Sequence, residues 1–363
     1  MQITMGGKTY DVRWIDRLDF ALKHLSRLNI KPHWITFDTE SSGLHLIKDR
    51  AFLGAVAWHT DTERVVYVFP AAGPDKQAPS SHWAHLISMS KLVHAVYAHN
   101  TVYDMHMYEN EVGEGAARSI KNWADLMGLL RVSFDAVSPR DGGDKLALKI
   151  VARKYIDPDA DQYELEVKSW LKEKEKANRK ILRAFLKPTG WGIQMFDAAL
   201  KEGIDTLPPD VREIYEDWRE AYPVPNYREV PMEIMIPYVA TDVILTDLGV
   251  EMSVPVVSMR NQWGVMDREW RNLPWTFKMT RRGFRIDREY LKYCDPRLAA
   301  YIKKLQAKMH ELAGRVFTVG QDEVIKDIYE ERTGKRPPNT DKKFLKKMSD
   351  EGDELAGIIK KLR

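Results

Sequence analysis

The chain has 363 residues, of which 44% are hydrophobic and 30% are charged. This length and composition allow two or three domains, each with its own hydrophobic core. The formal net charge of +3 at pH 7 is too small to identify a nucleic-acid-binding protein by charge alone. It is compatible with an enzyme that combines an acidic metal pocket with basic surface for holding phosphates.

Membrane and disulfide-based proteins are excluded by the sequence. No run of about 18 or more apolar residues occurs, and the N-terminus lacks the charged-then-apolar order of a secretory signal. We therefore expect a soluble, cytoplasmic protein with no membrane partner. The single cysteine, Cys294, excludes an internal disulfide and a cysteine-based metal site. Any metal ion would be held by oxygen or imidazole, which makes carboxylates the main candidates.

The first part of the chain mixes strand and helix patterns. Short β-rich apolar runs predict strands at 34–37, 52–58, 65–69 and 93–97. Helical patterns interleave with and follow these runs, at 102–110, 123–130 and 146–155. Strands followed by helices predict an α/β domain with a mixed sheet.

A highly charged segment comes next, at 157–188. Its alternating basic and acidic residues predict a solvated amphipathic helix, which we favour over a DNA-contacting surface. A helix is expected at 208–222 and a loop at 223–231. A long helix at 238–252 should close the first domain.

After Pro255 the sequence changes to long helical stretches that are rich in Lys, Arg and Glu and separated by glycines and prolines. The chain ends within a helical pattern and without a cap, as though the fold continued elsewhere. We expect a first domain at 1–253, with a charged helical insertion at about 158–230, and a smaller helical domain at 254–363.

Polar side chains follow two of the predicted strands. Asp38 and Glu40 lie at the end of the first strand, and they point to one face because side chains alternate across a strand. Asn100 and Asp104 come directly after another strand, where a helical spacing of four would place them on one side of a helix. The sequence therefore predicts two groups of polar side chains near strand ends.

A third pair, Tyr238 and Asp242, has the same spacing of four within the long predicted helix. Each pair alone has an ordinary explanation: a capped turn, a solvated first helical turn, or a core aromatic with its hydroxyl at the surface. The signal is the occurrence of all three pairs in this order, separated by long stretches of chain.

Four carboxylates, those of Asp38, Glu40, Asp104 and Asp242, would repel one another and raise one another's pKa values if they converged. Such a cluster is favourable mainly when divalent cations neutralise it. Ligation by oxygen alone selects Mg²⁺ or Mn²⁺, and two such ions about 4 Å apart can stabilise the attacking and leaving oxygens of a phosphoryl displacement. The sequence therefore predicts a site for divalent metal ions.

These motifs resemble the exonuclease superfamily named for its Asp-Glu-Asp-Asp carboxylates, in the branch with tyrosine in the third motif. They look most like the proofreading domain of family A (polymerase I-like) DNA polymerases, and the matching segments are Phe37-Asp-Thr-Glu-Ser-Ser-Gly-Leu44, Tyr97-Ala-His-Asn-Thr-Val-Tyr-Asp104 and Tyr238-Val-Ala-Thr-Asp242. The likeness covers roughly 34–252, including the helical segment 145–155. It implies a ribonuclease H-like fold, which is an α/β mixed sheet flanked by helices, followed by a smaller mostly helical region.

The later region adds a second likeness. Residues 273–287 resemble the entry of that family into its polymerase module, and 339–345 and 358–363 resemble the start of its thumb. The palm and fingers are missing, since the chain contains no His-Asp-Glu tripeptide and no Lys-x-x-x-Tyr-Gly segment. We expect no nucleotidyl transfer from this chain alone.

The resemblance implies a 3′-5′ exodeoxyribonuclease that hydrolyses single-stranded or frayed DNA ends to nucleoside monophosphates in a bacterial or phage-infected cell. In the roles it implies, Asp38 bridges both metal ions, Glu40 and Asp242 complete the site that activates water, and Asp104 serves the second ion. Tyr238 would orient the attacking water. With an ordinary pKa of about 10, this tyrosine is a poor base at neutral pH.

The same likeness gives candidates for binding the DNA end. Leu44 matches the position where the family wedges an apolar side chain between terminal bases, and a core role for this leucine is an equal alternative. Asn100 and Tyr103 match positions that hold the terminal nucleotide, and Thr39 is a further binding candidate. Stacking of aromatic side chains on unpaired bases tolerates any sequence, which suits an enzyme that must degrade any end.

One residue departs from the expected pattern. Pro237 directly precedes Tyr238, and a proline has no backbone N–H and kinks a helix that has already begun. We therefore expect the helix that carries the third motif to begin at Tyr238. A bend within the helix would displace the tyrosine hydroxyl and slow hydrolysis.

Two other functions stay open at this point. A ribonuclease D-like RNA exonuclease shares the same carboxylates and tyrosine, and no feature of the sequence reports a contact to a 2′-hydroxyl. The chain is alternatively the non-polymerising half of a split DNA polymerase, whose main role is to dock a separate palm-and-fingers polypeptide through the region after Pro255. The segment 273–287 favours DNA over RNA.

Overall fold

The computed structural model describes residues 1–71, 81–134 and 146–363. The chain divides into two compact units, Met1–Gly283 and Phe284–Arg363. None of the helices in the described ranges combines the length and the apolar character that crossing a membrane requires.

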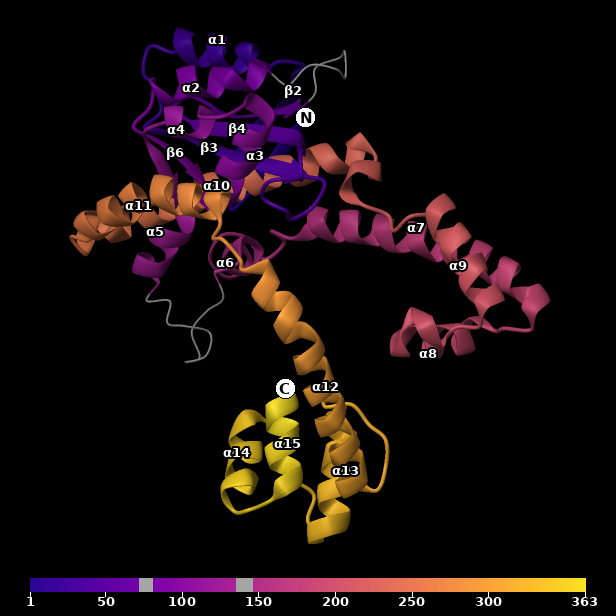
Figure 1. Ribbon diagram of the computed structural model, residues 1–363. Helices are drawn as coiled ribbons and strands as arrows, with labels where there is room; N and C mark the ends of the chain where they lie inside the picture. Colours follow the sequence, from indigo (N-terminus) through magenta and orange to yellow (C-terminus); the bar gives the residue numbers. More distant parts are fainter. Residues whose placement is uncertain (72–80, 135–145) are drawn as a thin grey trace. The chain divides into compact units, whose positions relative to one another are not determined.

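A seven-stranded sheet forms the centre of the first unit, with the order β1-β2-β5-β4-β3-β6-β7 (Figure 1). The pairs β1/β2, β3/β4 and β4/β5 are antiparallel, whereas β2/β5, β3/β6 and β6/β7 are parallel. The strands are β1 (Gln2–Met5), β2 (Lys8–Trp14), β3 (Trp34–Ser41), β4 (Ala51–His59), β5 (Arg64–Pro70), β6 (Ala95–Ala98) and β7 (Trp123–Asp125).

Helices cover both faces of this sheet. The helices that follow or interleave with the strands are α1 (Asp19–Arg27), α2 (His85–Ser90), α3 (Thr101–Val112), α4 (Ala116–Ser119), α5 (Leu126–Ser133) and α6 (Leu148–Tyr155). The later ones are α7 (Gln162–Leu186), α8 (Ile193–Glu202), α9 (Pro209–Ala221), α10 (Met232–Met259) and α11 (Trp263–Arg282). The prediction of an α/β fold with a mixed sheet flanked by helices is confirmed.

The alternation of side chains along β3 explains how the two faces differ. Ile35 and Phe37 point into a core shared with α1, α2, α3 and α11. On the other face, Tyr10 of β2 and Leu53 of β4 belong to a core shared with α10 and the start of α7. β4 lies between β3 and β5 and is buried along most of its length. An apolar run of this kind is what a central strand covered on both faces requires.

The four predicted strands are present, at β3, β4, β5 and β6. The predicted helix at 123–130 is correct only in part, because its first three residues form β7, which pairs with β6. The N-terminal hairpin of β1 and β2 was not predicted. In these strands the buried residues are separated by exposed or half-buried polar ones, so the strands lack the apolar runs on which the other strand predictions rested.

The charged insertion forms a helical substructure of α7, α8 and α9 (Figure 1). The expected amphipathic helix is the 25-residue α7, and the C-terminal part of its apolar face packs in a small separate core with α8 and α9. That core consists of Leu182, Leu186, Phe196, Leu207, Val211 and Trp218.

The first compact unit extends beyond the expected domain end at residue 253. Helix α11 contacts α3, α5 and β7, and its Leu273 and Phe277 join the core next to the sheet. The division between units therefore follows Gly283. The second unit contains α12 (Arg288–Ala313), α13 (Asp322–Thr333), α14 (Lys342–Asp350) and α15 (Glu354–Leu362), which share a core around Ile325, Tyr329 and Leu355. The predicted helical character of this region is confirmed.

Candidate metal centre

Strand β3 presents its two acids to helix α10. Thr36, Asp38 and Glu40 alternate with Ile35 and Phe37, so they share the opposite face of the sheet. The Thr36 hydroxyl donates a hydrogen bond of 3.1 Å to the main-chain carbonyl of Val243 in α10, which shows that this face meets the helix. The register of β3 and α10 therefore brings Asp38 and Glu40 next to the part of the helix that carries the third motif.

Helix α10 contributes Asp242 to the same place. Asp38, Glu40 and Asp242 each offer a carboxylate oxygen, and these oxygens all lie within 4.8 Å of one another. Asp38 and Glu40 are half-buried and Asp242 is buried. Two segments far apart in the sequence thus build one cluster of oxygen ligands.

Asp104 reaches the strand from the other side. It lies in the first turn of α3 and accepts a hydrogen bond of 2.8 Å from the hydroxyl of Thr39, whose side chain alternates with those of Asp38 and Glu40. Within the described part of the chain, the group of acids that can jointly hold one ion contains the other three carboxylates and not Asp104. Asp104 nevertheless acts on the cluster, since its charge raises the pKa of Asp38 more than the charge of any other residue does.

Burial and the charges of neighbouring acids disfavour the ionised forms of Asp38, Glu40 and Asp104. Burial, and after it the charges of Asp104, Asp242 and Glu40, raise the pKa of Asp38 well above its ordinary value. Burial, followed by the charge of Asp242, does the same to the pKa of Glu40. Burial also raises the pKa of Asp104 to about 8, against the hydrogen bonds from Thr39, which lower it. A divalent cation would reverse these shifts, so the donor set fits a hard metal ion bound through oxygen.

A lysine that the sequence did not single out lies in this cluster. Lys149 of α6 forms an ion pair with the Oδ1 atom of Asp242, and its charge lowers the pKa values of Asp38 and Glu40. Its Nζ atom also lies 5.4 Å from the centre of the Tyr238 ring. Residues 146–155 were predicted as a helix, but a lysine on an amphipathic helix carries no signal that distinguishes this position from a solvated one.

Tyr238 lies one helical turn before Asp242 and is buried, with 9% of its surface exposed. Its ring centre lies 6.0 Å from that of Tyr227. Burial, followed by the negative charges of Asp242 and Glu40, raises the pKa of Tyr238 far above the ordinary value. The phenol therefore stays protonated at neutral pH, where it can donate a hydrogen bond but cannot act as a base.

The expected start of this helix at Tyr238 is wrong. Helix α10 begins at Met232, so Pro237 lies inside it. The first N–H groups of a helix have no partner within the helix, so a proline is readily accommodated in the first turn. Pro237 is the sixth residue of α10, and it removes a backbone hydrogen bond that an ordinary residue would make there. The Thr241 hydroxyl donates to the Pro237 carbonyl at 2.8 Å, which adds a local bond in this stretch. The packing of α10 across the sheet outweighs the local preference of the proline.

The candidates for binding a DNA end lie in different environments. Leu44 is 87% exposed, so it takes no part in the core. The Tyr103 hydroxyl donates a hydrogen bond of 2.9 Å to the Gly43 carbonyl and also bonds to Ser41, which ties α3 to the loop before Leu44. Thr39 is buried and bonded to Asp104.

The helical spacing expected for Asn100 and Asp104 does not hold. Asn100 precedes α3 in the left-handed conformation, with φ 66°, and is exposed. Asparagine tolerates this conformation better than most residues. Its N–H donates a hydrogen bond of 3.0 Å to the Asp125 carboxylate, which holds the backbone at this turn outside the helix.

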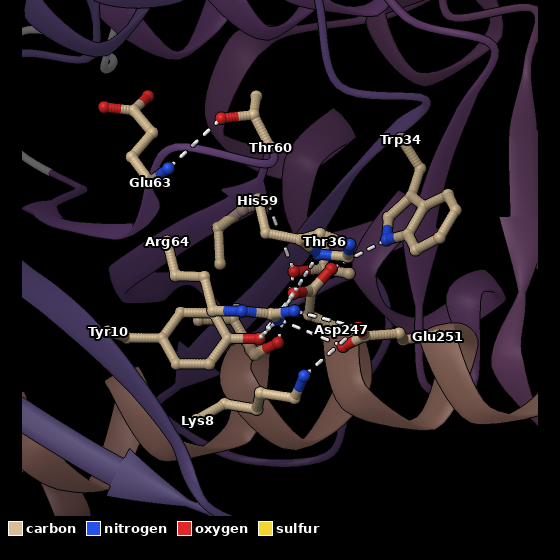
Figure 2. Close-up of polar contacts among 12 residues, drawn as sticks. Lys8, Tyr10, Trp34, Thr36, His59, Thr60, Glu63, Arg64, Asp247 and Glu251 are labelled. Atoms are coloured by element: carbon tan, nitrogen blue, oxygen red, sulfur yellow. Dashed lines mark hydrogen bonds and ion pairs between the residues drawn. The ribbon is translucent and has the colours of Figure 1, made fainter.

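A second polar network anchors α10 to the sheet beyond the acidic cluster (Figure 2). Fully buried Asp247 accepts hydrogen bonds from the Tyr10 hydroxyl at 2.6 Å, the Trp34 indole at 2.7 Å and His59 at 2.7 Å. Arg64 pairs with Glu251 through two bonds of 2.8 and 3.0 Å and donates to Tyr10 at 2.9 Å. These bonds connect β2, β3, β4 and β5 to one helix, and they fix the position of α10 relative to β3.

Comparisons with known proteins give a likeness in fold. No protein family matches the chain, and no curated protein matches it either. Among solved structures, Brucella melitensis NrnC with bound Mg²⁺ has 11% sequence identity and a TM-score of 0.41, over 76% of this chain and 93% of that one. The POL domain of Pol1 from M. smegmatis, in complex with DNA primer-template and dNTP, has 10% identity and a TM-score of 0.50. That match covers 96% of this chain and 47% of the Pol1 chain, so this chain spans about half of its length.

Proposed function

We propose that this protein is a metal-dependent 3′-5′ exonuclease that hydrolyses single-stranded or frayed DNA ends to nucleoside monophosphates. The observation that carries the proposal is the convergence of Asp38, Glu40 and Asp242, with oxygens within 4.8 Å, from a strand end and a helix that are far apart in the sequence. Buried acids with raised pKa values are unfavourable for stability alone, and they are typical of a site that binds divalent cations.

Asp38, Glu40 and Asp242 would hold one Mg²⁺ or Mn²⁺ ion, and Asp104 together with Asp38 would hold a second. When bound, such ions lower the pKa of water and offset the charge on the leaving oxygen of a phosphodiester. The protonated hydroxyl of Tyr238 would orient the attacking water. The exposed side chain of Leu44 would separate the terminal bases, while Thr39, Asn100 and Tyr103 would line the place of the terminal nucleotide.

The preference for DNA and a proofreading role are supported by the resemblance of residues 273–287 to a polymerase entry segment. That segment begins in α11, which belongs to the first unit and packs there against α3, α5 and β7. The fold likeness to a polymerase domain agrees with this arrangement.

The proposal is tested with single-stranded DNA labelled at its 5′ end, incubated with the protein and Mg²⁺ or Mn²⁺. We expect stepwise shortening from the 3′ end, and a loss of at least a hundredfold in rate in Asp38→Ala, since this removes a carboxylate on which the charges of all three others act. Equal inertness of the wild type and this variant under both metals would refute catalysis. A matched RNA oligonucleotide in the same assay decides between DNA and RNA, and faster RNA cleavage would favour the ribonuclease alternative.

A further inference from the structure

The acidic cluster contains a cation of its own. The ammonium of Lys149 contacts Asp242, and both side chains are largely enclosed, with exposed fractions of 16% and 12%. The same Nζ atom lies 5.4 Å from the ring centre of Tyr238, which precedes Asp242 by one helical turn. Lys149 thus sits against the face of α10 from which the candidate metal ligand projects.

This position places the ammonium among the acids of the cluster. The positive charge of Lys149 acts on both Asp38 and Glu40, the two acids that β3 contributes. One cation beside several enclosed carboxylates compensates part of their repulsion. It compensates only part, because the pKa values of Asp38 and Glu40 stay well above their ordinary range.

A divalent ion and the ammonium compete for the same atoms. Oxygen ligands of Mg²⁺ and Mn²⁺ must point their lone pairs at the ion, whereas the ammonium already occupies Oδ1 of Asp242. Two cations that share one small cluster also repel each other. The lysine side chain has a flexible four-carbon stem, so its head can leave the cluster without movement of the helix.

We propose that Lys149 is a built-in counter-ion of the acidic cluster that stabilises the metal-free fold and is displaced from Asp242 when a divalent ion binds. Lys149 is a positioning residue in this role, because it acts through Asp242. The proposal rests on the metal site proposed above. The proposal predicts two effects of removing the lysine charge. The metal-free protein should become less stable, and the affinity for a divalent ion should increase.

The first experiment measures Mn²⁺ binding to the full chain without substrate, by electron paramagnetic resonance of free Mn²⁺, together with the melting temperature in EDTA. Lys149→Met should bind Mn²⁺ roughly tenfold more tightly, as the loss of one nearby like charge implies, and should melt at a lower temperature in EDTA. Lys149→Arg keeps the charge and should stay close to the wild type in melting temperature. Lys154→Met removes a lysine from the exposed side of the same helix and should change neither quantity.

Unchanged or weaker Mn²⁺ binding by Lys149→Met would overturn the proposal, since the ion pair would then be a fixed part of the site. A different result would contradict the proposed function. If the wild type does not bind Mn²⁺, or if Asp38→Ala binds it as tightly as the wild type, the acidic cluster is not a metal site.

A second experiment uses the wild type, so it does not depend on any variant folding. Lysine acylation by a succinimidyl ester is followed at each lysine by mass spectrometry, in EDTA and in Mn²⁺, with Lys154 as the internal reference. We expect acylation of Lys149 to increase several-fold in Mn²⁺ because the displaced amine becomes accessible. An equal or smaller extent of acylation in Mn²⁺ would show that the ammonium stays on Asp242.

Discussion

Asp104 illustrates what burial does to a single carboxyl group. Its pKa rises to about 8 from an ordinary value of 3.8, so the folded chain keeps a proton that the unfolded chain has released. Between these two values the unfolded state binds fewer protons than the folded state, and the free energy of unfolding must fall as pH rises. Asp38 and Glu40 have pKa shifts in the same direction and add to the effect.

We therefore predict that the metal-free protein melts at progressively lower temperature as the pH increases from about 4 to 8. Mn²⁺ should flatten this dependence, because it binds the ionised carboxylates. The measurement is a series of thermal melts in EDTA and in Mn²⁺. Asp38→Asn should reduce the slope in EDTA, whereas Glu216→Gln, which changes an exposed acid of α9, should leave it unchanged. A melting temperature in EDTA that rises over this interval would contradict the assignment.

The sequence predicted the acidic residues of the cluster but not its basic one. Asp38, Glu40 and Asp242 follow from the two-residue and four-residue spacings that bring side chains to one face of a strand or helix. Lys149 has no such signature, since its contact with Asp242 arises from how α6 packs against α10. Asn100 was misplaced because a left-handed residue before a helix breaks the helical spacing on which the prediction depended.

At the level of elements, helix α10 combines a local defect with extensive tertiary support. Pro237 lacks the N–H that would donate to the carbonyl of Glu233, and a proline inside a helix costs about 3 kcal/mol relative to alanine. The helix forms nevertheless because it contacts six strands of the sheet and because Asp247 and Glu251 bond to them. This is also why the start of the helix could not be predicted from local sequence rules.

Pro237→Ala should raise the free energy of unfolding by about 1 kcal/mol, because the regained hydrogen bond exceeds the loss of some buried ring surface. Urea denaturation of the two proteins measures the change. Pro231→Ala is the matched control: Pro231 is the N-cap residue of α10, where no N–H bond within the helix is lost, so this variant should bring no gain. A Pro237→Ala protein that is no more stable than the Pro231→Ala protein would contradict this explanation.

At the level of the whole molecule, every residue of the candidate metal centre lies in the unit Met1–Gly283. Phe284 is 91% exposed and starts the second unit, which has a separate core. We predict that a fragment of residues 1–283 folds cooperatively, binds Mn²⁺ with the affinity of the full chain within about twofold, and keeps any exonuclease activity on short oligonucleotides.

Calorimetry and the Mn²⁺ titration described above test this prediction. The same fragment with Asp38→Ala serves as the control for metal binding. A shorter fragment of residues 1–253 lacks α11, whose Leu273 and Phe277 fill the core beside the sheet, and it should aggregate or melt at a markedly lower temperature. Equal stability of the two fragments would show that the first domain ends where the sequence pattern alone placed it.

The sequence was most informative about the centre of this unit. The buried strands β3, β4 and β5 have short, β-rich apolar runs, so both their presence and the mixed α/β class followed from the pattern along the chain. The unit boundary could not be predicted, since α11 looks like any charged amphipathic helix until its apolar side is seen to pack on α3. The hydrogen-bond network around Asp247 could not be predicted from the sequence either, because its members come from five separate elements.

The order in which the cluster is synthesised has a consequence for the nascent protein. Thr36 of β3 bonds to Val243 of α10 across 207 positions of sequence, so the strand with two of the acids leaves the ribosome long before the helix that completes the site. At translation rates of about 5 to 20 residues per second, this delay lasts roughly 10 to 40 s. For the proposed nuclease, a polypeptide still being made would lack the complete metal site, which would form only when most of the unit has been translated.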